Sequence, residues 1–129
     1  MITFIINLII LLIIAWIIGE QRANCGKAIG FRSLAVLMLG AYTFTYLSCG
    51  PFGVIDYHVI AQIVTGISFV GAGLIFKDKS VHNLTTAILV WTMASIAVLL
   101  GLNKTIESII LSIIILGILS FKNKKIWKL

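Results

Sequence analysis

Charged residues are scarce in this chain of 129 residues. Asp, Glu, Lys and Arg make up only 11% of it, whereas a soluble globular domain averages about 25%. Hydrophobic residues make up 60%, and the mean hydropathy is +1.16. A folded body this small could not cover its surface with polar groups. These numbers exclude a soluble enzyme, a disordered segment and a nucleic-acid-binding domain as descriptions of the whole chain.

Proline and cysteine are also rare, and each shortage excludes something. A single proline leaves helices free to run without interruption. Cys25 and Cys49 are the only cysteines, and no histidine stands at zinc-ligand spacing from them. Neither a Ser-His-Asp nor a paired-carboxylate pattern is recognisable in the sequence. We therefore expect no enzyme activity and derive no cofactor from the residues.

Charged residues divide the chain into long uncharged stretches. They cover residues 1–19, 33–55, 57–76, 80–103 and 108–121. A helix needs about 20 apolar residues to cross a bilayer, and the last stretch reaches that length only if the helix takes in Glu107. The pattern predicts an all-α polytopic membrane protein, one domain over residues 1–129. Its five transmembrane helices are expected near 2–18, 33–49, 59–76, 84–101 and 106–121.

The basic residues predict the orientation of these helices. Nine of the ten lie in alternate segments, and such segments face the cytoplasm. The nine are Arg22, Lys27, Arg32, Lys77, Lys79, Lys122, Lys124, Lys125 and Lys128. The N-terminus is then outside and the C-terminus cytoplasmic. Cys25 and Cys49 fall on opposite sides, too far apart for a disulfide.

The helix expected at 59–76 has one small, polar face. It consists of two neighbouring stripes, Ala61-Thr65-Ser68-Ala72 and Gln62-Gly66-Phe69-Gly73. Small residues let helix backbones approach closely in lipid. The pattern predicts that this face is the packing centre of the bundle or of a dimer, so Gly66 and Gly73 should resist enlargement. We also expect Asn7 to bond between helices and Trp91 to be buried.

Three segments together resemble a known family. The first is Gly19-Glu20-Gln21-Arg22, followed by Gly30-Phe31-Arg32. The second is the run from Ala61 to Gly73, and the third is Leu84-Thr85-Thr86-Ala87 with Trp91. In these motifs, which cover residues 19–101, the chain is similar to the MgtC/SapB membrane proteins. Gln21, His58 and His82 depart from the residues usual in that family.

The resemblance implies a multi-pass protein of the bacterial inner membrane. It implies a link to magnesium homeostasis, to growth in low magnesium and to virulence, and for some members inhibition of the rotary F-type ATP synthase. The chain looks like a short member without the soluble C-terminal domain of longer relatives. The residues that the motifs point to are Glu20, Arg22, Gly30, Arg32, Gln62, Gly66, Phe69, Gly71, Ala72, Gly73, Thr85, Thr86 and Trp91.

Two functions follow as hypotheses. The first is a regulator in the lipid bilayer that docks through its helices onto another membrane protein or a second copy, as a homo-oligomer such as a dimer. In this hypothesis Arg32 pairs with Glu20 or with an aligned backbone carbonyl and so shapes the contact surface. The second is an oligomeric transporter or channel for Mg²⁺ or another ion, with Asp56 and Glu20 as weak metal candidates. The first is favoured, because no span has an ionisable residue at its middle and ion pathways usually do.

Overall fold

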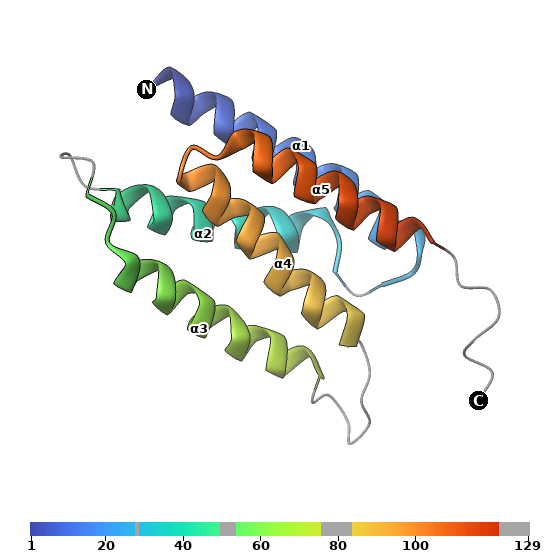
Figure 1. The fold of residues 1–129 in the computed structure, drawn as a ribbon. Coiled ribbons are helices and arrows are strands. Elements are labelled where there is room, and N and C mark those ends of the chain that lie inside the picture. Colours follow the sequence, from blue (N-terminus) through green and yellow to red (C-terminus); the bar gives the residue numbers. More distant parts are fainter. Residues whose placement is uncertain (28, 50–53, 76–83, 122–129) are drawn as a thin grey trace.

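A computed structural model describes residues 1–27, 29–49, 54–75 and 84–121. The chain forms five helices in it, α1 (Ile2–Asn24), α2 (Phe31–Ser48), α3 (Tyr57–Ile75), α4 (Leu84–Gly101) and α5 (Thr105–Ser120). Across the described ranges the β-structure is a single isolated bridge between Cys49 and Ile55. The all-α prediction is confirmed. The helices run up and down, with α2 and α4 between α3 on one side and α1 and α5 on the other (Figure 1).

The predicted boundaries hold to within two residues at the described helix ends, except at the end of α1. The sequence predicts a stop near residue 18, and the helix runs on to Asn24. Nothing in the sequence breaks it earlier, and it stops where Gly26 adopts a positive φ of 65°, a conformation that favours glycine. Glu20 and Arg22 therefore lie on a helix and not in the loop that the sequence predicts.

The helices differ in how well they suit a bilayer. By length and composition, α1, α3 and α4 could each cross a membrane. α2 has 18 residues but includes Arg32 and several hydroxyl-bearing side chains, and α5 has only 16 residues. The five expected helices are thus confirmed in the described residues, while five membrane crossings stay a prediction. The loop with Lys77 and Lys79 and the basic tail lie outside the described residues.

The core lies where α2 and α4 meet. Tyr42 and Met38 of α2 and Met93 and Leu100 of α4 are among the largest fully buried side chains. Gly101 allows the close approach, because a Cβ atom there would lie 2.6 Å from Cβ of Thr45. No real Cβ contact is that short, so only glycine fits.

A second close approach joins α1 to α2. A Cβ atom on Gly19 would lie 2.5 Å from both N and Cα of Phe31. The obstacle is backbone, which cannot move aside as a flexible side chain can. Gly19 and Gly101 therefore allow two neighbouring helices, α1 and α4, to approach α2 closely.

The prediction that α3 is the packing centre is wrong for a single chain. Only Ile67 and Gly71 are buried on this helix. Both lie on the bulky, aliphatic side of the helix, opposite the small face that was expected to make the contacts. A Cβ atom added to Gly66 or to Gly73 would meet no neighbouring group within 4 Å. α3 uses its aliphatic side against the bundle and turns its small face outward. The dimer alternative stays a prediction.

These contacts reverse the expected sensitivity of the glycines. Gly101→Leu should lower the stability of the protein in detergent by about 1–3 kcal/mol or more, because it overpacks the contact with Thr45. Gly66→Leu should change it little, since the site is open. Thermal unfolding followed by circular dichroism measures both. Equal losses for the two variants would contradict this packing.

Candidate functional site

Motif residues from distant parts of the sequence meet at one end of the bundle. This end, here called the Arg22 end, is where α1 stops and where α2 and α4 begin. Gly19 contacts the start of α2, and Arg22 contacts the start of α4. Two of the three motif segments thus form one structure.

Arg22 is the centre of the Arg22 end. Only 4% of its surface is exposed, and its Nη2 donates a hydrogen bond of 2.9 Å to Oγ1 of Thr86. Its Nε is buried without a partner among the described residues. A buried cation is costly unless it is well bonded. The sequence pattern predicts Arg22 in a basic loop, whereas it joins α1 to α4 inside the fold.

The Gln21 departure also has a structural explanation. Nε2 of Gln21 donates a hydrogen bond of 2.9 Å to the carbonyl oxygen of Leu119 in the last turn of α5. An ionised glutamate at this position would have no N–H group and could not donate this bond. Gln21 and Arg22 therefore attach the end of α1 to two different helices.

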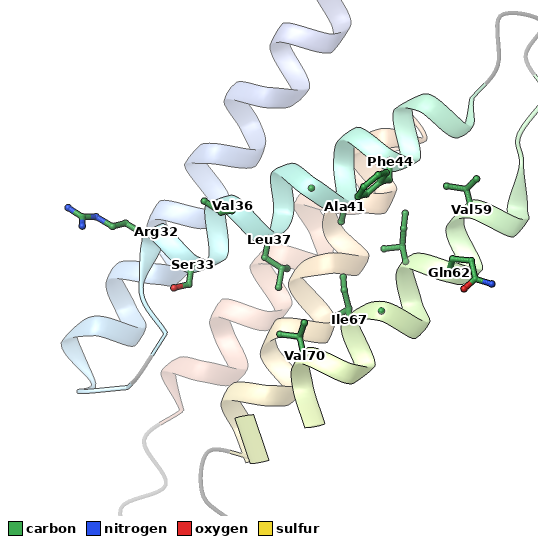
Figure 2. Close-up of a pocket in the computed structure, with 13 residues that line it drawn as sticks. Arg32, Ser33, Val36, Leu37, Ala41, Phe44, Val59, Gln62, Ile67 and Val70 are labelled. Carbon is green, nitrogen blue, oxygen red and sulfur yellow. The ribbon is translucent and has the colours of Figure 1, made fainter. Parts of the chain in front are cut away.

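Glu20 and Arg32 do not form the expected pair. Both side chains are exposed, and within the described ranges the ion pair found is Lys104–Glu107, at 3.8 Å. The side chain of Arg32 extends past the end of α2 (Figure 2). The pairing with Glu20 is therefore wrong, and the exposed Arg32 is available at the Arg22 end.

An apolar groove begins beside Arg32 and runs between α2 and α3 (Figure 2). Its volume is about 800 Å³. The lining residues are Arg32, Ser33, Val36, Leu37, Gly40, Ala41 and Phe44 of α2, and Val59, Gln62, Ile63, Gly66, Ile67 and Val70 of α3. Gln62 and Gly66, which belong to the second motif, therefore border a groove and not a helix contact.

The remaining motif residues do not gather at one site. Phe69 is 83% exposed and Trp91 is 49% exposed, so the expected burial of Trp91 is wrong for the single chain. Gly73 and Thr85 are exposed, and Ala72 is half-buried. Gly71 faces α4, where a Cβ atom would lie 3.6 Å from the carbonyl oxygen of Ala87. Gly30, the N-cap of α2, is half-buried.

The two metal candidates lie at opposite ends of the bundle. Asp56 precedes α3, and its Oδ1 accepts a hydrogen bond of 2.9 Å from the backbone N–H of His58. It acts as a helix cap there. Glu20 is exposed near the other end of the bundle. In the part of the chain that the structure describes, no three His, Cys, Asp or Glu residues are grouped as metal ligands.

Asn7 confirms the prediction of a polar contact between helices. It is 1% exposed, and its Nδ2 donates to the carbonyl oxygen of Leu100 at 3.1 Å and to Oδ1 of Asn103 at 3.2 Å. Its Oδ1 accepts a hydrogen bond of 3.0 Å from Oγ1 of Thr105. The carboxamide thereby joins α1 to the turn between α4 and α5.

Comparison with known proteins agrees with the motifs. A model of the MgtC family matches residues 8–126. This chain belongs to the MgtC family. Protein MgtC of Salmonella typhimurium strain LT2 is 34% identical over 117 residues, which cover 90% of this chain and 51% of that protein. Protein MgtC of Brucella abortus is 34% identical over 104 residues, 79% of this chain and 44% of that protein.

A differently named relative comes from Escherichia coli K12. The protein named "Putative magnesium transporter YhiD" is 32% identical over 108 residues, 76% of this chain and 50% of that protein. The chain thus spans about half the length of the curated relatives it matches. No solved structure matches it. Family membership and the apolar helices together indicate a membrane protein.

The Arg22–Thr86 contact can be tested with two adjacent threonines. Thr86→Val keeps the shape of the side chain but removes the acceptor for Arg22, and should cost about 1.5–3 kcal/mol, as for hydrogen bonds to charged groups. Thr85→Val is the matched control, because Thr85 is exposed. Thermal unfolding in detergent should separate them. If both valines behave like wild type, Arg22 does not depend on Thr86.

Proposed function

We propose that this MgtC-family protein is a non-catalytic, multi-pass protein of the bacterial inner membrane that supports magnesium homeostasis by docking onto another membrane protein. The docking surface is part of the small face of α3, formed by Ala61, Thr65, Ser68, Ala72 and Gly73. The observation that carries the proposal is its exposure: in a chain of apolar helices, the face best suited to helix contact is unused.

Physical chemistry favours a helix as the partner of the small face. Lipid provides no hydrophobic drive between helices, so close backbone approach and van der Waals contact decide which faces pair. The hydroxyls of Thr65 and Ser68 bond to carbonyl oxygens of Ala61 and Val64 in their own helix, at 3.1 and 2.8 Å. The face therefore needs no polar partner and presents a shallow surface to a neighbouring helix.

The link to magnesium and to a particular partner rests on relatives. One relative carries the name "Putative magnesium transporter YhiD". The resemblance to the MgtC/SapB proteins suggests the F-type ATP synthase as a partner. A second copy of the chain is the alternative occupant. In either case the Arg22 end faces the cytoplasm and the N-terminus lies outside, as the basic residues predict.

A transporter or channel is the second candidate, because one relative carries a transporter's name. Gln62 is exposed on α3 and, in an oligomer, it could line a shared path. Mg²⁺ prefers carboxylate ligands and keeps several waters. The docking function remains favoured, since the described helices bring no carboxylates together on this face.

The two free cysteines test the orientation. Cys25 caps α1 and is exposed, whereas Cys49 caps α2 at the other end and is half-buried. With each cysteine studied alone in intact cells, a membrane-impermeant thiol reagent should label Cys49 and leave Cys25 unmodified until the cells are opened. Labelling of Cys25 from outside would reverse the orientation.

Two glycines in open surroundings test the docking surface. Gly73 of α3 and Gly117 of α5 are both exposed, and a Cβ atom added to either would meet no neighbouring group within 4 Å. Gly73→Leu should weaken binding of the partner about 5- to 150-fold, the range that 1–3 kcal/mol of overpacking gives, and should impair growth in low magnesium. Gly117→Leu should behave like wild type.

The measurements are growth of a deletion strain complemented with each variant and co-purification of the ATP synthase or of a tagged second copy. Equal growth of the Gly73→Leu and Gly117→Leu strains would show that the small face of α3 is not needed for the function. Mg²⁺ flux into liposomes that contain the purified wild type would instead establish the transporter.

A further inference from the structure

The groove between α2 and α3 is concave, apolar and open to the surroundings of the protein. Apart from Arg32, Ser33 and Gln62, its lining side chains are hydrocarbon or glycine. If α2 and α3 span the bilayer, this surface contacts lipid or another molecule inside the membrane. The question is which occupant its length and charge fit.

The length of the groove corresponds to one leaflet. Its lining on α2 runs from Ser33 to Phe44, which is about 16 Å at 1.5 Å per residue. The hydrocarbon core of a bilayer is about 30 Å thick, so one leaflet contributes about 15 Å. An extended acyl chain that entered from the Arg32 side would therefore reach the far end near Phe44.

The polar groups of the groove are unequal at its two ends. Arg32 lies at the beginning of α2, and its guanidinium extends beyond the end of the helix (Figure 2), while its hydrocarbon stem borders the groove. Ser33 adds a hydroxyl, and the N-terminus of α2 has no side-chain cap. At the far end the polar group is the neutral amide of Gln62. A negative charge is favoured at one end only.

The shape of the groove suits a narrow occupant. A helix is about 10–12 Å wide with its side chains, whereas an acyl chain is much narrower and can lie along the groove between α2 and α3. The groove offers a volume of about 800 Å³ for it. A neighbouring helix that rests on the groove is the other occupant, which the experiments below distinguish.

We propose that this groove binds an anionic phospholipid, with its phosphate at Arg32 and Ser33 and an acyl chain along the apolar lining. Arginine is well suited to the phosphate, because its planar donors match phosphate oxygens. Basic residues between transmembrane helices commonly bind anionic headgroups in this way. The inference needs only that α2 and α3 cross the membrane, and it is independent of the docking partner and of the orientation.

The test is native mass spectrometry of the full chain, purified from nanodiscs of phosphatidylglycerol and phosphatidylcholine in equal amounts. Wild type should retain phosphatidylglycerol preferentially. Arg32→Gln should lower that preference about fivefold, the effect of about 1 kcal/mol for one basic residue. Arg32→Lys should retain most of it, because the charge remains. Arg32 is exposed, so neither variant should disturb folding.

A second pair of variants tests the groove itself. Gly66→Leu fills the groove from α3 without meeting another atom, whereas Gly73→Leu adds the same side chain on α3 outside the groove. Gly66→Leu should reduce retention of both lipids, and Gly73→Leu should not. Circular dichroism confirms that each variant is folded.

Three results would overturn the proposal. The first is an unchanged lipid preference in Arg32→Gln, and the second is unchanged lipid retention in Gly66→Leu. The third is a dimer in wild type that Gly66→Leu converts to a monomer with no loss of lipid, which would show that a second copy occupies the groove. None of these results depends on growth in low magnesium, so the proposed function is tested separately.

Discussion

The position of α2 depends on two places where a neighbouring helix offers no side chain. Gly19 of α1 lets the backbone of Phe31 approach at one end of α2, and Gly101 of α4 receives Thr45 near the other end. Inside a membrane, lipid provides no hydrophobic drive between helices, so the van der Waals contact at such close approaches stabilises their packing instead. With α2 held at both ends, the large side chains of α2 and α4 form the core between them.

Hydrogen bonds then attach the outer helices to this pair. Arg22 and Gln21, adjacent on α1, bond to α4 and α5, and Asn7 does the same near the other end of α1. α3 shares none of these bonds among the described residues and is held by its aliphatic side alone. The molecule therefore combines a bonded group, α1, α2, α4 and α5, with one helix whose small face and groove are open.

Much of the fold could be predicted from the sequence, and the errors have a common cause. Uncharged stretches located all five helices, and a lone amide in an apolar helix marked Asn7 as a contact. Periodicity showed which residues of α3 share a face, but a face does not reveal which neighbour it meets. The small face was therefore assigned to the bundle, although the aliphatic face packs there.

The candidate site was the harder part, because it depends on residues far apart in the sequence. The motifs marked Arg22 and Thr86, but their contact joins residues 64 positions apart, and no local pattern encodes it. The importance of Gly101 likewise appears only when Thr45 stands opposite it. Trp91 was expected to be buried and is exposed, whereas Arg22 was expected in a loop and is buried. The position of a residue along the chain does not determine its burial within the bundle.

The hydrogen bonds of Asn7 have a consequence for how the protein folds while it is being synthesised. Asn7 leaves the ribosome before its partners, which lie 93 to 98 positions later in the chain. Until α4 and the turn after it have been synthesised, α1 carries a carboxamide without these partners in an apolar environment, at a cost in free energy. The contacts of α1 are thus completed only after α4 and the following turn have been made, and a ribosome stalled within α4 would leave a nascent chain in which α1 is held only weakly.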